Sequence, residues 1–116
     1  MTAYAIAHIR PDHDNPHEDV LRYIEEIQAT MDPFGGRFLV HGQEVEVMEG
    51  PFPGTVVVIG FPDIESARAW YASPAYQAIL PLRTDHVPSE AVLVDGVPAD
   101  YDASRTAARL RAAAGR

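Results

Sequence analysis

The side chains best suited to binding a small molecule lie close together in the second half of the chain. Trp70, Tyr71, Ser73, Tyr76 and Arg83 combine aromatic surfaces with hydrogen-bonding groups. A guanidinium can hold a carboxylate through two parallel hydrogen bonds, and ligand pockets commonly have apolar walls with a few polar groups. The segment therefore predicts a small pocket that could clamp a carboxylate, with Trp70, Tyr71 and Arg83 as ligand-binding residues.

A purely structural interpretation of the same side chains stays open. Trp70 could only anchor a helix to a sheet, and Ser73 could only cap a turn. Arg83 could only pair with a nearby carboxylate such as Glu49. The residue types alone favour neither interpretation decisively.

His8 is the candidate for proton transfer. It follows Tyr4 and Ile6 on one face of a predicted strand, and an imidazole directed toward a helix-lined cavity can act as a general base. We expect His8 to join the ligand-binding residues and name it as the weak catalytic candidate, while a role as a packed core or rim residue stays open. His41, beside Gly42 near a strand end, is a weaker candidate.

Carboxylates and imidazoles also crowd the segment before the first predicted helix: Asp12, His13, Asp14, His17, Glu18 and Asp19. Such groups can ligate a divalent metal, but acidic residues in a first helical turn also complement the helix dipole. Pro16 disrupts the helical spacing that His13 and His17 would need. We predict no metal. No cofactor is predicted either, since the glycines lack the spacings that cradle phosphates.

Composition restricts the class of protein. A chain of 116 residues with 47% hydrophobic and 22% charged content is expected to form one domain. The absence of cysteine excludes disulfides and thiolate sites, and the net charge of −8 argues against nucleic acid and membrane surfaces as partners. No basic N-terminal segment precedes a long apolar run, so we expect a cytoplasmic location.

Hydrophobic spacing predicts the element order β, α, β, β, α, β, that is, an α+β ferredoxin-like sandwich. The expected strands are Tyr4–Ile9, a second strand of Arg37–Val40 and Gln43–Met48 broken near Gly42, Thr55–Phe61, and Glu90–Val94; the expected helices begin at Asn15–Pro16 and at Pro62–Asp63, the second with a fresh cap at Ser73–Pro74. Residues 1–96 form the predicted domain and residues 97–116 a tail that is partly helical or flexible.

The third predicted strand implies a dimer. Val56 and Val58 make one of its faces apolar, and Val57, Ile59 and Phe61 make the other face apolar. Two helices cover only one face of a four-stranded sheet, so we expect a second copy of the chain to cover the other. The alternative is that the tail folds back over that face.

The tail differs from the body in charge. All 17 acidic residues precede residue 103, whereas Arg105, Arg109, Arg111 and Arg116 follow it. Such a segment could dock on the acidic body of a partner subunit, or it could form a solvated helix that frays.

Four sequence segments carry a family resemblance. The stretch FPDIESARAWYASPAYQAILPLR from Phe61, the upstream GGRFLVHG, the MEG at Met48–Gly50 and the VLVDG ending at Gly96 resemble an uncharacterised bacterial family catalogued as domain of unknown function thirteen-thirty. The resemblance covers roughly residues 4–96. That family is similar to dimeric α/β-barrel proteins, which implies ferredoxin-like protomers with two sheets back to back. The superfamily includes cofactor-free oxygenases, isomerases, dehydratases and heme-degrading enzymes, and fold kinship alone transfers none of these activities.

Two functions follow as hypotheses. The first is a cofactor-free enzyme or binder of a small organic ligand, held between helices and sheet by His8, Trp70, Tyr71 and Arg83. The second is a non-enzymatic homodimeric module with a structural or regulatory role.

Overall fold

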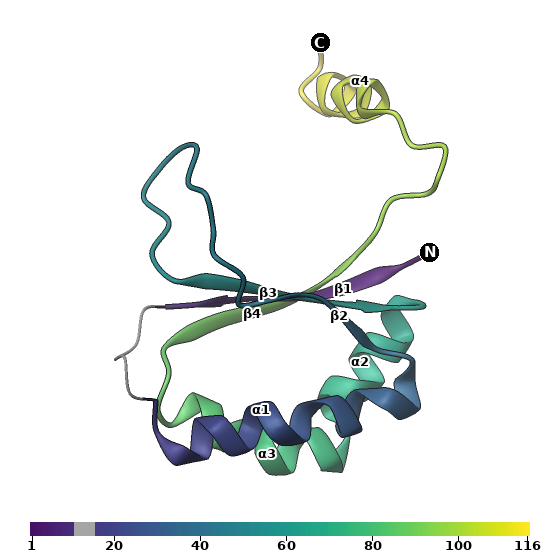
Figure 1. Cartoon of the computed structure of the whole chain (residues 1–116). Helices are drawn as coiled ribbons and strands as arrows, with labels where there is room; N and C mark the ends of the chain where they lie inside the picture. Colours follow the sequence, from purple (N-terminus) through teal and green to yellow (C-terminus); the bar gives the residue numbers. More distant parts are fainter. Residues whose placement is uncertain (11–15) are drawn as a thin grey trace.

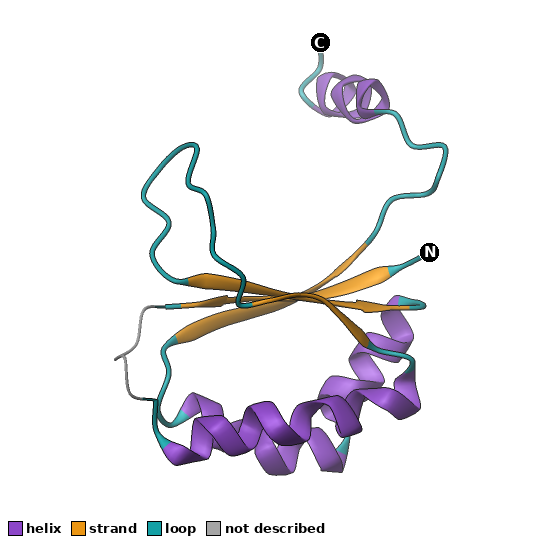
Figure 2. Ribbon diagram, in the orientation of Figure 1, coloured by secondary structure: helices purple, strands orange, loops and turns teal. Residues whose placement is uncertain are grey.

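The computed structural model describes residues 1–10 and 16–116, and it contains one sheet with helices packed on one side (Figures 1 and 2). The elements are β1 (Ala3–Ile9), α1 (Glu18–Met31), the short 3-10 helix η1 (Asp32–Phe34), β2 (Arg37–His41), β3 (Thr55–Phe61), α2 (Ile64–Ala72), α3 (Pro74–Thr84), β4 (Ser89–Asp95) and α4 (Ala103–Ala113).

The sheet has the strand order β2-β3-β1-β4, and every neighbouring pair is antiparallel. In the middle of β1, Ala5 lies opposite Ile59 of β3 and Leu93 of β4. This order, with α1, α2 and α3 on one face, confirms the predicted ferredoxin-like sandwich (Figure 1). None of the helices in the described part of the chain is long and apolar enough to cross a membrane.

Local capping explains the two consecutive helices after β3. The Asp63 side chain accepts a hydrogen bond from the Ser66 N–H and begins α2. The Ser73 hydroxyl accepts one from the Tyr76 N–H, and Pro74 occupies the first turn of α3. The predicted fresh cap at Ser73–Pro74 is therefore confirmed.

The predicted start of the first helix is wrong by a few residues. α1 begins at Glu18, and the Nδ1 atom of His17 accepts a hydrogen bond from the Asp19 N–H. Asn15, the expected cap, lies outside the described residues. An imidazole nitrogen can satisfy an unpaired N–H of a first turn as an Asn side chain does, which spacing arguments based on preferred cap residues do not anticipate.

The second strand is shorter than predicted, because it ends at His41 and residues 43–48 form no strand. To extend the pairing, β3 would have to begin before Thr55, but Pro51 and Pro53 lack the N–H groups that a ladder needs. The chain instead turns at Gly42, which has a φ of 76°, and residues 42–54 form a long loop that rises from the face without helices (Figure 1).

The core lies between the sheet and the helices. Its buried side chains are Ala5, Tyr23, Ile27, Met31, Ile59, Phe61, Ala67, Trp70, Tyr76 and Ile79. The opposite face, which we call the open face, carries exposed aliphatic side chains: Val92 is 56% exposed, Leu39 45% and Val94 44%.

The tail does not cover the open face, so the alternative that it folds back over its own sheet is wrong. Residues 103–113 form α4, which stands away from the sheet, and each of its residues except Thr106 is exposed (Figure 1). In the single chain the open face therefore stays exposed.

Candidate functional site

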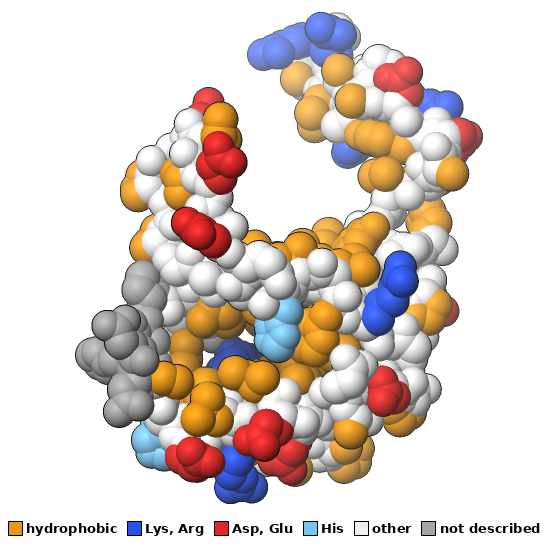
Figure 3. Space-filling model, in the orientation of Figure 1, with side chains coloured by type: hydrophobic (Ala, Val, Ile, Leu, Met, Phe, Trp, Pro, Cys, Tyr) orange, Lys and Arg blue, Asp and Glu red, His pale blue; other side chains and the backbone are white. Residues whose placement is uncertain are grey.

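A cavity of about 310 Å³ lies between the sheet and helices α1, α2 and α3. Ala5 and Ala7 of β1 and Ala91 of β4 form part of its sheet wall. Because these side chains end at Cβ, the helices cannot close the space above them. Figure 3 shows the hollow, bordered by hydrophobic side chains.

Among the described residues that line the cavity, Arg83 is the one arginine or lysine, and it is only 8% exposed. Its Nη1 atom donates to the Ser89 hydroxyl, and its guanidinium carbon lies 5.4 Å from the centre of the Tyr23 ring. In residues 1–10 and 16–116, no acidic side chain forms an ion pair with Arg83. The expected alternative partner, Glu49, lies in the loop on the open face, so that pairing is not what holds Arg83 in place.

Two phenols share the cavity wall with Arg83. The hydroxyl oxygens of Tyr23 and Tyr76 lie 2.7 Å apart, which is a hydrogen bond. Burial raises the pKa of Tyr76, the neighbouring Tyr23 raises it further, and Arg83 only partly opposes the shift. Tyr76 is therefore a neutral hydroxyl at physiological pH. Each phenol has one proton, and their mutual bond uses one, so the second proton can be donated to a ligand atom beside Arg83.

Trp70 and Tyr71 complete the aromatic wall. Trp70 is 3% exposed, its Nε1 donates to the Thr30 hydroxyl at 3.0 Å, and its ring centre lies 4.2 Å from that of Tyr76. Tyr71 lines the cavity and is 36% exposed. The Ser73 hydroxyl donates to the Trp70 carbonyl and accepts from the Tyr76 N–H at the start of α3. Both bonds agree with the interpretation of Ser73 as a structural cap. The structure thus brings Trp70, Tyr71 and Arg83 together around one cavity; their binding role stays a prediction.

His8 does not join them, and its expected position is wrong. It lies opposite Val56 and Glu90 on the open face, where its ring stacks on Phe52 at 4.5 Å and its Nε2 meets the Pro53 carbonyl at 2.5 Å. Alternation correctly places His8 on the same face as Tyr4 and Ile6, but the helices cover the other face. His8 therefore anchors the 42–54 loop.

His41 takes the place expected of His8. A β-bulge between Phe38 and Val40 sets three β2 residues against two of β3, so Phe38 faces Ile59 and His41 faces Val57. Both Phe38 and His41 therefore face the helices, and their rings stack at 4.1 Å. His41 lines the cavity. Only a signal for the bulge could have revealed this, since unbroken alternation places residues 38 and 41 on opposite faces.

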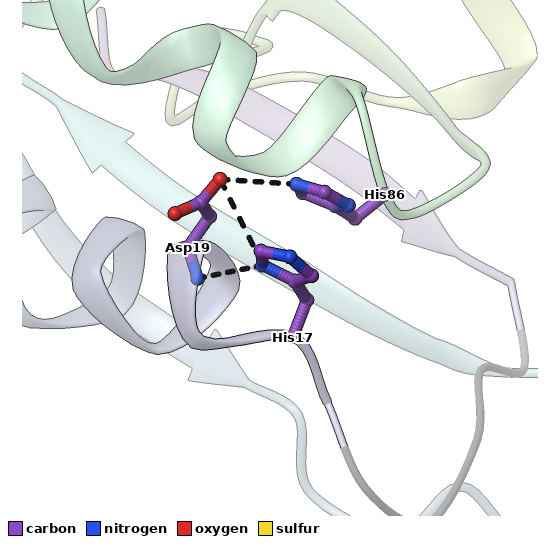
Figure 4. A group of neighbouring side chains, drawn as sticks. All are labelled: His17, Asp19 and His86. Atoms are coloured by element: carbon purple, nitrogen blue, oxygen red, sulfur yellow. Dashed lines mark hydrogen bonds and ion pairs between the residues drawn. The ribbon is translucent and has the colours of Figure 1, made fainter.

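A second polar cluster lies away from the cavity, where α1 begins and α3 ends. Asp19 Oδ2 lies 3.1 Å from His86 Nε2 and 3.7 Å from His17 Nδ1, and the two imidazoles stack at 3.7 Å and 12° (Figure 4). Parallel rings direct their in-plane lone pairs side by side rather than at one ion, and His17 Nδ1 already accepts the Asp19 N–H. The cluster joins the ends of two helices. The other residues of the metal hypothesis, Asp12, His13 and Asp14, lie outside the described residues.

The sequence of this chain matches a family model over most of its length. That model, described as "Domain of unknown function (DUF1330)", matches residues 2–97. The chain belongs to this family. The resemblance predicted from the motifs is thus confirmed, and the matched region ends at residue 97, where the tail begins. No curated protein sequence matches the chain.

Solved structures share the fold of this DUF1330 chain at low identity. A protein of unknown function from Rhodopseudomonas palustris, RPA0582, has a TM-score of 0.63 at 15% identity, covering 84% of this chain and 83% of that one. SnoaB, a cofactor-independent oxygenase from Streptomyces nogalater, has a TM-score of 0.59 at 16% identity, covering 87% and 98%. A dimeric ferredoxin-like protein of unknown function from Thermobifida fusca has a TM-score of 0.55 at 19% identity, covering 83% and 92%. These likenesses establish the fold.

Proposed function

We propose that this DUF1330 chain binds a small, mostly apolar molecule with one carboxylate in the cavity between the sheet and the helices. The observation that carries the proposal is Arg83, a nearly buried cation in a mostly apolar wall with no acidic partner among the described residues. A charge removed from water without a counter-charge costs several kcal/mol. A ligand carboxylate would supply the missing charge.

The surroundings of Arg83 suit such a ligand. A guanidinium offers two parallel donors to a carboxylate, and the spare phenol proton of Tyr23 or Tyr76 adds a third. Trp70 and Tyr71 offer aromatic contact to the rest of the molecule. The volume of about 310 Å³ is near the lower limit for ligand pockets, which favours a compact ligand.

We infer that ligand binding is the main function of the cavity and that catalysis is the second candidate. SnoaB is a cofactor-independent oxygenase with this fold, which makes a cofactor-free reaction in the same cavity the second candidate. Among the described lining residues, His41 is the imidazole that could move a proton there, whereas Arg83 stays charged and Tyr76 stays neutral. His8, on the open face, stays an untested candidate for a site of its own.

A matched pair of probes tests the binding proposal. Calorimetric titration with hydrocinnamate is expected to show binding, and titration with hydrocinnamide, which has the same shape without the charge, is expected to show binding at least about 30-fold weaker. The reason is that only the carboxylate neutralises Arg83. Equal affinity for the two probes, or binding of neither carboxylate nor amide across a panel of such aromatic pairs, would contradict the proposal.

We also propose that the chain is a homodimer joined through the open face, as the sequence predicted. Exposed Leu39, Val92 and Val94 make that face apolar, and similar ferredoxin-like structures are dimeric. A non-enzymatic dimeric module is the function that this observation favours independently of the cavity.

Charge placed on the open face is expected to break the dimer. Val92→Arg should raise the dimer dissociation constant at least about 100-fold, because the interface would bury two unpaired guanidiniums, one from each protomer. Sedimentation equilibrium measures this. The matched control is Ile24→Arg, an equally apolar-to-cationic change on α1, where Ile24 is 45% exposed. Loss of the dimer in both variants, or in neither, would contradict the assignment of the interface.

A further inference from the structure

Two segments rise from the open face with most of their residues exposed, and the first of them meets the body of its own protomer at His8, through Phe52 and Pro53. One is the 42–54 loop and the other is the arm, residues 97–116, which contains α4 (Figure 1). They make the chain much wider than a compact one: its radius of gyration is 16.9 Å, against about 13 Å expected for a globular domain of this length. Figure 3 shows them as two walls on either side of a gap above the sheet.

The two segments carry opposite charge. The loop holds Glu44, Glu46 and Glu49 and no basic residue. Residues 103–116 of the arm hold four arginines and no acidic side chain. Within the described residues, the one ion pair made by an arginine of α4 is Arg105 with Asp100, at 3.9 Å and with both side chains exposed. Most of the charge on both segments is therefore available to a partner.

Both segments also expose apolar side chains. In the loop, Met48 is 82% exposed and Val47 48%; in the arm, Val97 is 61% exposed and Leu110 58%. Leu110 lies between Arg109 and Arg111 in the sequence. Each segment thus presents apolar and charged groups together, which is typical of surfaces that become covered in an assembly.

The loop and the arm leave the sheet at opposite ends. The loop enters β3 at Thr55, which pairs with Ile9, whereas the arm leaves β4 after Asp95, which pairs with Ala3. Within one protomer, the loop and the arm therefore rise from opposite ends of the sheet. Two copies can face each other across a two-fold axis that exchanges those ends. The arm of each copy then lies beside the loop of the other copy.

We propose that in the homodimer the basic arm of each protomer docks on the acidic 42–54 loop of a second copy of this chain. This inference rests on the proposed dimer through the open face. The contact forms twice by symmetry, with α4 arginines facing the loop glutamates and Leu110 covering apolar loop residues. A basic helix can also attract nucleic acid, but the acidic body, which gives the chain a net charge of −8, opposes that partner.

Two complementary charge-reversed chains test whether the contact forms between copies. The arm variant carries Arg109→Glu and Arg111→Glu, and the loop variant carries Glu44→Arg and Glu46→Arg. Each homodimer then sets like charges against each other, whereas a mixed dimer restores opposite charges at both contacts. After mixing at low salt, native mass spectrometry is expected to show mixed dimers above about 90%, against about 50% for random exchange, falling toward random at about 1 M salt as the charges are screened.

A control separates the contact from overall charge. The variant with Arg22→Glu and Arg68→Glu has the same net charge as the arm variant, but its changes lie on helices α1 and α2. Mixed with the loop variant, it is expected to form mixed dimers close to the random fraction. Near-random mixing of arm and loop variants, or the same preference with the control, would overturn docking between copies. A wild-type chain that sediments as a monomer would overturn the dimer itself, while leaving the cavity proposal untouched.

Discussion

Trp70→Ala is expected to lower the free energy of unfolding by about 3–5 kcal/mol, measured by urea denaturation followed by circular dichroism. Trp70 is 3% exposed, and its ring centre lies 5.3 Å from Phe61 and 4.2 Å from Tyr76. Truncation therefore removes the side chain that joins α2 to both β3 and α3. It also enlarges an existing cavity, so the neighbours cannot easily collapse into the space.

The variant Trp70→Phe serves as the control for the lost hydrogen bond. It keeps most of the aromatic volume but removes the Nε1–H that donates to Thr30. Thr30 still donates to the Ile27 carbonyl at 2.7 Å, so about 1–2 kcal/mol should be lost. A loss below about 1 kcal/mol for Trp70→Ala would mean that Trp70 does not hold the helices on the sheet.

The elements that sequence predicted well are those with local signals. Asp63 and Ser73–Pro74 give caps at their own positions, and the two-sided apolar strand Thr55–Phe61 has the predicted bounds. These signals act over a few residues, so no tertiary contact is needed to interpret them. The predicted elements, taken in chain order, give the ferredoxin-like pattern β, α, β, β, α, β.

The faces of the sheet were harder to assign. Alternation placed His8 with Tyr4 and Ile6 correctly, but a period of two residues does not say which face the helices cover. The covered face of β1 is the one with Ala5 and Ala7, where small side chains leave room for a ligand. Tyr4, Ile6 and His8, which were expected to face the helices, instead face the surface proposed for the dimer.

Two side-chain arrangements that the sequence did not predict depend on non-local geometry. His41 reaches the cavity only because a β-bulge shifts the β2 register, and His86 meets His17 only because the ends of α1 and α3 adjoin. The predicted strand over residues 43–48 failed for a similar reason, since no strand of residues 1–10 and 16–116 lies opposite its alternating pattern. Pattern alone cannot supply a partner strand.

Arg83→Met is expected to weaken hydrocinnamate binding by about 30- to 1,000-fold while leaving the fold as stable as before or more stable. The loss of binding follows from the lost charge-assisted hydrogen bonds to the carboxylate, worth about 2–4 kcal/mol. The stability gain follows because methionine fills a similar space without a buried, unpaired charge; replacements of this kind are neutral or stabilising. Titration calorimetry and urea denaturation of the same preparations measure the two effects.

Weaker probe binding together with an unchanged or higher free energy of unfolding distinguishes a binding residue from a structural one. If Arg83 served only to join α3 to Ser89 and Tyr23, its removal would lower the free energy of unfolding and change probe binding only through misfolding. Arg68→Met, at an exposed arginine of α2, is the matched control and should change neither quantity. A second variant, Ala7→Leu, fills the cavity while keeping Arg83, and it should also abolish probe binding without loss of stability. Binding that survives both Arg83→Met and Ala7→Leu would place the ligand outside this cavity, since one variant removes the charge and the other removes the space.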